Sequence, residues 1–218
     1  MKNKLWSYGC SFTTGFNGVD FYNDNLCWYG ILAKKLGLEL NNSGKPNQCN
    51  WVSILHFLNT RDEIKTGDVV IFEFTFFDRF NIFPLTAQLE NLQDFIIQHH
   101  KGNLVGVGAL IKDYIYNWFV KHVFNYCKER NIELYCWSLE GQTHVEYKRY
   151  SDIINFIPAP NSTNENPNYA FYTEWQQHNQ NQWARVDHDM VLNDTHFNVE
   201  THDIVANHIF ECINTYKK

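Results

Sequence analysis

Residues 69–74, Val-Val-Ile-Phe-Glu-Phe, constrain the fold more than any other part of the sequence. This nearly continuous apolar run follows the turn residues Gly67 and Asp68, and it predicts a strand that is buried on both faces. Strands of this kind are typical of parallel sheets, because helices cover both faces of such sheets. The segment therefore indicates an α/β architecture with a central sheet between two layers of helices.

The rest of the chain alternates between strand and helix patterns, as this architecture requires. Further strands are predicted at residues 5–8, 38–41 and 132–138, and helices at 51–60, 85–99, 110–130 and from 201 onward. An earlier helix is predicted to pass through Trp28, Ile31, Leu32 and Leu36. Asp24 or Asn25 is expected to cap the first helix, and Gly37 is expected to end it. The order strand, helix, strand implies right-handed crossovers and hence a mostly parallel sheet.

Composition favours one globular domain spanning 1–218. Of the 218 residues, 44% are hydrophobic and 19% are charged, which is enough to bury a core. The net charge of −6 provides no basic surface for nucleic acid or for an anionic membrane. The region 141–190 is rich in Asn, Gln, His and Pro, and we expect a loop-rich insertion there.

The same composition favours a cytoplasmic protein without a cofactor. No apolar run is long enough for a transmembrane helix, and the run after the basic residues 1–4 lacks the core of a signal peptide. The six cysteines contain no CxxC pair and are interpreted as reduced thiols. Neither the pair 99–100 nor the Asp-His-Asp run at 187–189 has partners at ligand spacing, so no metal site is predicted.

Ser11 is the first candidate for chemistry. The first predicted strand ends abruptly at Gly9, so Ser11 follows at its carboxyl end, the edge where open α/β sheets bind their ligands. A serine there is a candidate nucleophile, but it needs a base. His196, with Asp194 two residues before it, is a candidate base at the far end of the chain.

Both motifs are similar to those of a known family. Gly9-Cys10-Ser11-Phe12 resembles the first block, G-D-S, of the SGNH or GDSL hydrolases, and Asp194-Thr195-His196 before a last helix resembles their late block. Members are three-layer α/β/α, flavodoxin-like esterases, lipases and carbohydrate deacetylases. The resemblance implies that Ser11 is the nucleophile, that His196 is the general base, and that Asp194 orients the imidazole. The family spaces its pair as D-x-x-H, and Asn193 occupies that aspartate position here.

The resemblance also implies an oxyanion hole. Residues 42–47 resemble the second block, N-x-x-x-x-G, with Asn47 at the glycine position, where a backbone N–H is the donor. Residues 75–78 align with the third block, G-x-N-D, but Phe77 replaces its donor asparagine. The expected donors are the Ser11 and Asn47 amides, with the Thr75 hydroxyl or the Asn50 side chain.

Asp78, the last residue of the third block, and Arg79, which follows it, are expected to contact the substrate. A surface ion pair with Asp78 or Glu73 is an equally simple role for Arg79.

The favoured function is a serine esterase or carbohydrate deacetylase that cleaves an acyl ester of a small molecule or a glycan. One alternative is a non-catalytic member of the same fold that binds a glycan or a protein, because Phe77 weakens the predicted oxyanion hole. Another is an acyltransferase that uses the same triad. Simpler roles also exist, since Ser11 fits a turn cap and His196 is one of ten histidines.

Overall fold

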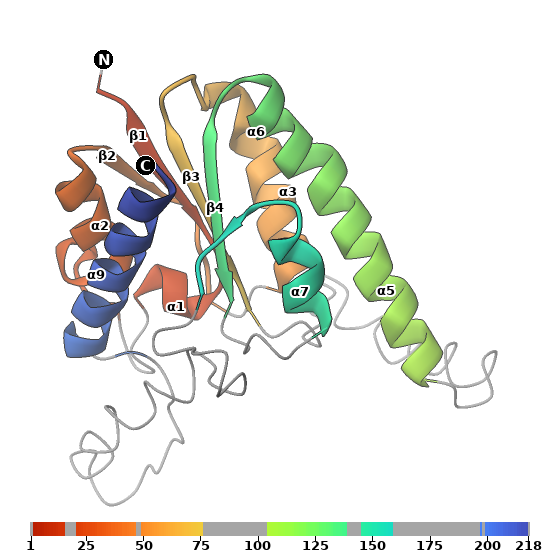
Figure 1. Cartoon of the computed structure of the whole chain (residues 1–218). Helices are drawn as coiled ribbons and strands as arrows, with labels where there is room; N and C mark the ends of the chain where they lie inside the picture. Colours follow the sequence, from red (N-terminus) through yellow and green to blue (C-terminus); the bar gives the residue numbers. More distant parts are fainter. Residues whose placement is uncertain are drawn as a thin grey trace, which may run out of the picture.

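The computed structural model describes residues 2–15, 21–46, 49–75, 104–138, 145–158, 197 and 199–217, with the backbone alone for 104–111 and 145–147. These residues contain a five-stranded sheet in which every neighbouring pair is parallel, in the order β2-β1-β3-β4-β5 (Figure 1). The strands are β1 (Lys4–Tyr8), β2 (Glu39–Asn42), β3 (Val69–Phe74), β4 (Glu133–Ser138) and β5 (Asn155–Phe156).

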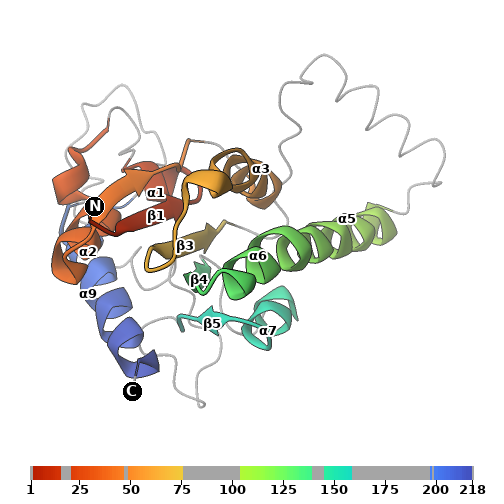
Figure 2. The ribbon, with the colours of Figure 1, turned by 90° about the horizontal axis from the view of Figure 1, so that it is seen from above.

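Helices connect the strands and cover both faces of the sheet. They are α1 (Ser11–Thr14), α2 (Trp28–Leu36), α3 (Asn50–Thr60), α5 (Leu104–Phe119), α6 (Asn125–Glu129), α7 (Val145–Ser151) and α9 (Val199–Tyr216). Short turns lie at η1 (Asp24–Leu26) and η2 (Arg61–Glu63), and the π-helical turn η3 (Val120–Phe124) joins α5 to α6. Figure 2 shows α2 and α9 on one side of the sheet and α3, α5, α6 and α7 on the other, which is a three-layer α/β/α arrangement.

Side-chain alternation along β3 supplies both cores. Val69 and Ile71 pack with α2 and α9, whereas Val70, Phe72 and Phe74 pack with α3, α5 and α6. All six residues of β3 are buried, as expected for a central strand with helices on both faces. None of the helices in the described part of the chain is long and apolar enough to cross a membrane.

Most predicted elements lie where the sequence placed them, but several differ. The prediction that Asp24 or Asn25 caps the first long helix is wrong, because Asp24 begins the turn η1 and α2 begins only at Trp28. The region 141–190 is not entirely irregular, since it contains α7 and β5. The helix expected at 110–130 begins at 104 and includes η3. The helix expected at 85–99 lies outside the described residues.

The strand order locates the place where a ligand would bind. From β1 the chain crosses to β2 on one side and later returns to β3 on the other, so the connections after β1 and β3 diverge. In sheets with the order 2-1-3-4-5 this divergence leaves a crevice at the carboxyl ends of those two strands. Ser11 follows β1 and Thr75 follows β3, so both residues lie at this edge (lower end of the sheet in Figure 1).

Candidate active site

The turn after β1 carries Ser11. This residue begins α1, and the amides of Thr13 and Thr14 donate to the carbonyl of Cys10 at 3.0 and 3.2 Å. Ser11 is 4% exposed. The sheet and the first turn of α1 therefore fix the predicted nucleophile at the carboxyl end of β1, in a largely buried position.

A buried glutamate of β3, Glu73, lies beside this turn. Its Oε2 accepts hydrogen bonds from the Cys10 amide at 3.1 Å and from the Thr13 hydroxyl, and its Oε1 accepts one from Cys10 Sγ at 3.0 Å. The residue is 1% exposed. Both carboxyl oxygens thus bind the turn, with donors on either side of Ser11.

Gly9 leaves the space that this acid occupies. A Cβ atom at Gly9 would lie within 3.0 Å of both Thr13 Oγ1 and Glu73 Oε2, which is closer than real Cβ atoms come to other atoms. The glycine of the Gly-Cys-Ser motif is therefore required by the close approach of β3 to the turn.

The loop after β2 lies against the other side of the turn. The Lys45 amide donates to the carbonyl of Gly9 at 3.2 Å, and a Cβ atom on Gly44 would lie 2.7 Å from Thr13 Cγ2. This loop leads directly to Asn47, the predicted oxyanion donor, which is itself outside the described residues.

Asn50 holds the residue that follows β3. The Thr75 amide donates to Asn50 Oδ1 at 2.9 Å, and Asn50 Nδ2 donates to the Thr75 carbonyl at 3.3 Å. Thr75 is 1% exposed and Asn50 is 4% exposed. The side chain therefore pairs with the Thr75 backbone as a neighbouring strand would, and it fixes the end of β3 with one of its two N–H donors.

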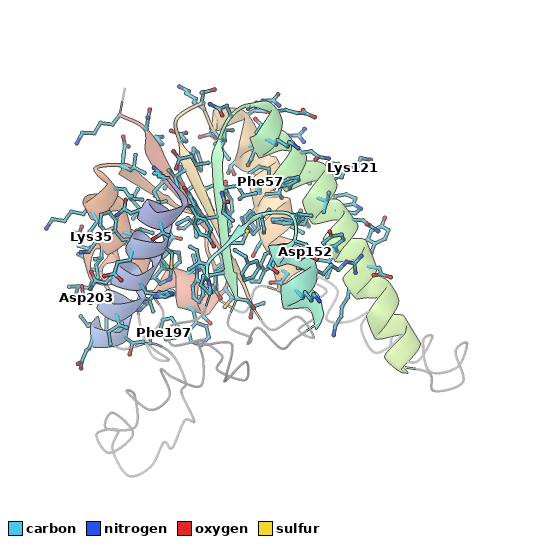
Figure 3. The ribbon with its side chains drawn as sticks, viewed as in Figure 1. Lys35, Phe57, Lys121, Asp152, Phe197 and Asp203 are labelled. Atoms are coloured by element: carbon cyan, nitrogen blue, oxygen red, sulfur yellow. The ribbon has the colours of Figure 1, made fainter. Side chains whose placement is uncertain are left out.

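Two phenylalanines that follow the predicted catalytic residues in the sequence are in contact. The ring centroids of Phe12 and Phe197 lie 4.6 Å apart at an interplanar angle of 61°, and both rings are buried. Phe197 lies near α1 and the start of α9 (Figure 3). Phe12 follows Ser11 and Phe197 follows His196 directly, and consecutive Cα atoms are only about 3.8 Å apart. The contact therefore joins the residue after Ser11 to the residue after His196.

Several solved structures are similar to this one. TesA has a TM-score of 0.54 at 10% identity, covering 98% of this chain and 99% of that chain. A carbohydrate esterase family 2 enzyme with a carbohydrate-binding domain, from Corynascus thermopiles (Myceliophthora fergusii), has a TM-score of 0.53 at 10% identity, covering 99% and 66%. A member of the lipolytic protein G-D-S-L family from Veillonella parvula DSM 2008 has a TM-score of 0.47 at 15% identity, covering 95% and 96%.

Comparison of sequences finds no relative of this chain, whereas comparison of structures does. No family model and no curated protein matches the chain. The shared fold with TesA and with the carbohydrate esterase extends over nearly the whole chain. The chain has the SGNH-hydrolase fold.

A second histidine of this SGNH-fold protein, His202 in the first turns of α9, has a structural contact. Its Nδ1 accepts a hydrogen bond from the amide of Trp28 at 3.2 Å, and the residue is 1% exposed. Trp28 is the first residue of α2, whose first amides have no partner within the helix. His202 therefore caps α2 from a position 174 residues away, a role that differs from that predicted for His196.

Cys10 is not a competing nucleophile. Burial, the largest cause, and then the negative charge of Glu73 raise the pKa of the Cys10 thiol above its usual range. Because the thiolate is the reactive form of cysteine, the neutral thiol of Cys10 is inert near neutral pH.

The predicted site is described in part. Three of its residues, Ser11, Asn50 and Thr75, lie at the carboxyl edge of the sheet. The others lie outside the described residues: Asn47, Asp78, Arg79, Asp194 and His196. Within the described ranges, no group of three His, Cys, Asp or Glu side chains could hold a metal ion.

The sequence interpretation missed Glu73. It treated this residue as a member of an apolar strand and as a possible partner of Arg79, although the signal was present. A single acid inside a strand that is buried on both faces must find hydrogen-bond donors, because an unpaired buried charge is very costly. Its donors, Cys10 and Thr13, are 63 and 60 residues away, so no local pattern reveals them.

The buried thiols predict a pH dependence of stability. Burial raises the pKa of Cys127 to about 12 and raises the pKa values of Cys10 and Cys136 as well. Above pH ~8.5 the unfolded chain loses thiol protons that the folded chain keeps, so the free energy of unfolding should fall as pH rises. Each thiol contributes up to about 1.4 kcal/mol per pH unit.

Urea unfolding under reducing conditions at pH 7.5, 9 and 10 measures this slope. The variant Cys127→Ala should show a shallower slope than the wild type over the same range, whatever its absolute stability. Equal slopes in the two proteins would contradict the raised pKa of the Cys127 thiol in the folded protein.

Proposed function

We propose that this SGNH-fold protein is a serine hydrolase that cleaves an acyl ester, with Ser11 as nucleophile, His196 as general base and Asp194 as the residue that orients the imidazole. The contact between Phe12 and Phe197 carries the proposal, because each ring belongs to the residue that follows a predicted catalytic residue. The similar structures of esterases support the same reaction class.

In the proposed reaction, Ser11 Oγ forms a bond to the acyl carbon while its proton passes to His196. The resulting imidazolium gives this proton to the leaving alcohol oxygen, and an acyl-serine remains. Water then attacks the acyl carbon with His196 again taking a proton, which returns to Ser11 Oγ as the acid leaves. Asp194 stabilises the imidazolium in both steps.

The proposed oxyanion donors are the backbone amides of Ser11 and Asn47, with the Thr75 hydroxyl or the Asn50 amide as the third donor. Donors must be fixed before the reaction if they are to lower its barrier. The paired hydrogen bonds between Asn50 and Thr75 provide this rigidity at the end of β3. A donor from either residue would compensate for Phe77 at the position of the family's asparagine.

The proposed substrates are acyl esters of small molecules or glycans. The carbohydrate esterase among the similar structures supports the glycan class. Asp78 and Arg79 follow Thr75 by three and four residues, so we include them as substrate contacts near this edge. Arg79 would bind a carboxylate or phosphate group on the substrate.

A fluorophosphonate probe tests the proposal directly, since only an activated serine reacts with it. The wild type should form an adduct at Ser11, mapped by peptide mass spectrometry, and Ser11→Ala should form none. Ser53→Ala is the matched control, because Ser53 is another buried serine, on α3, and should leave labelling unchanged.

The outcomes separate the candidate functions. Folded wild-type protein that does not label would overturn the hydrolase proposal and favour a glycan- or protein-binding member of the fold. Labelling together with acyl transfer to an added alcohol, in place of water, would favour the acyltransferase.

A further inference from the structure

Glu73 is a buried acid for which the proposed reaction has no step. It faces the same side of β3 as Val69 and Ile71, the side covered by α2 and α9, and lies beside Trp137 of β4 in the sheet register. Burying a carboxylate is costly unless hydrogen bonds compensate for the lost water. A residue of this kind in the middle of the core needs a reason to be there.

The hydrogen bonds of Glu73 to Cys10 and Thr13 supply that reason, because both residues belong to the segment that carries Ser11. The Cys10 amide and thiol lie immediately before Ser11, and the Thr13 hydroxyl lies two residues after it. Hydrogen bonds to a charged acceptor are stronger than those between neutral groups. The carboxylate therefore fixes the turn on both sides of the nucleophile.

Ser11 depends on its turn because its own side chain has little else to hold it. Among the described residues, the hydrogen-bond contact of Ser11 Oγ is Cys10 Sγ at 3.9 Å, a long distance even for sulfur. The direction of the hydroxyl is thus set by the backbone of residues 9–13, and this backbone is held by Glu73.

We propose that Glu73 is a positioning residue, whose buried carboxylate holds the turn and so aims Ser11 Oγ at the substrate. This inference rests on the proposed hydrolase function. Both carboxyl oxygens of Glu73 must act as hydrogen-bond acceptors, because the groups of the turn that face them are donors. A glutamine at this position would keep the size of the side chain but place an NH₂ group, a donor, against the donors of the turn.

The variant Glu73→Gln tests this role, and the fold offers a matched control in Asp68→Asn. Asp68 is also a buried carboxylate that accepts three hydrogen bonds: from the amides of Lys4 at 2.7 Å and Lys65 at 3.0 Å, and from Trp6 Nε1 at 3.0 Å. It immediately precedes β3, at the opposite edge of the sheet from Ser11. The two substitutions therefore remove the same kind of interaction at opposite ends of the sheet.

The first readout is the second-order rate of fluorophosphonate labelling of Ser11, measured at a temperature where each variant is folded. Misplacing a reacting group by about 1 Å costs roughly a hundredfold in rate. We expect Glu73→Gln to lose about this factor and Asp68→Asn to label within about twofold of the wild type, even if both variants unfold at lower temperatures. Wild-type labelling rates in folded Glu73→Gln would overturn the inference.

The second readout does not depend on activity. Iodoacetamide alkylation of Cys10 is compared with that of Cys136, a fully buried cysteine of β4 in the same molecule that reports global unfolding. Each rate is divided by the thiolate fraction found from the pH dependence of alkylation, because the loss of the Glu73 charge also lowers the pKa of the Cys10 thiol. The ratio of the corrected rates should rise about tenfold in Glu73→Gln, because a charged hydrogen-bond acceptor of the turn is lost. It should stay constant in Asp68→Asn.

This ratio separates the two proposals. A wild type that does not label would overturn the hydrolase function, and the positioning role with it, while a raised ratio would still show that Glu73 holds the turn. An unchanged ratio in Glu73→Gln would overturn the inference whether or not the wild type labels.

A second pair of variants tests the same hydrogen bond if Glu73→Gln does not fold. Thr13→Val removes the hydroxyl that donates to Glu73 but keeps the methyl group that packs against Gly44, whereas Thr13→Ser keeps the hydroxyl. Labelling of Ser11 should slow at least about tenfold in Thr13→Val and recover in Thr13→Ser. Equal rates in these two variants would contradict a role for the hydrogen bond to Glu73.

Discussion

Replacing His196 with alanine is expected to lower the rate of ester hydrolysis at least about a thousandfold, with little change in stability. Removing the general base leaves the Ser11 hydroxyl protonated in the attack, and single triad residues of serine hydrolases carry effects of this size or larger. Hydrolysis of p-nitrophenyl acetate, followed at saturating ester, measures the change in kcat.

His202→Asn is the matched control for this prediction. Asparagine retains an acceptor that can replace Nδ1 opposite the Trp28 amide, so the cap of α2 is kept in part. We expect this variant to lower the free energy of unfolding by about 1 kcal/mol and to keep most of the activity. If His202→Asn abolished hydrolysis and His196→Ala did not, the general base would be His202 and the role proposed for His196 would be wrong.

Replacing Phe197 with alanine is expected to lower the free energy of unfolding by about 3–5 kcal/mol, the usual cost of truncating a buried phenylalanine. The ring is 2% exposed and contacts Phe12 at 4.6 Å and His202 at 5.5 Å between ring centroids. Urea unfolding measures the loss. Activity should fall as well in the protein that remains folded, because the chain next to His196 loses its anchor beside Ser11.

Phe197→Leu separates packing from a specific need for an aromatic ring. Leucine fills much of the same space, so it should recover most of the stability and of the activity. A Phe197→Ala variant as stable and as active as the wild type would contradict the idea that this contact joins the two motifs.

Local patterns were sufficient for the elements that determine the topology. β3 was predicted with its observed bounds, because six buried residues in a row leave few alternatives. The end of α2 at Gly37 was also predicted, and this glycine has the expected left-handed conformation with a φ of 70°. β5 was missed because its two residues, Asn155 and Phe156, are too few to show an alternation.

Contacts between distant residues were beyond such reasoning. The cap of α2 was sought in the neighbouring Asp24 and Asn25, yet it comes from His202 in α9. The partners of Glu73 are similarly remote in sequence. In contrast, the position of Ser11 could be predicted, since the end of an apolar strand and a following glycine are both local signals. The roles of Asp194 and His196 remain predictions from their motif.

The hydrophobic cores on the two faces of the sheet differ in the length of chain from which their residues come. Among the described residues, the core under α3, α5 and α6 consists of residues between Trp6 and Phe156, whereas the core under α2 includes Val205, Ile209 and Ile213 of α9. During synthesis these residues of the first core are all made before α9, whereas the second core is complete only after α9 has been made. Contacts across such long separations form slowly, because a large loop must close first. The face that carries α2 is therefore the last to become a folded layer, and until then its half of β1 and β3 is open to other apolar surfaces.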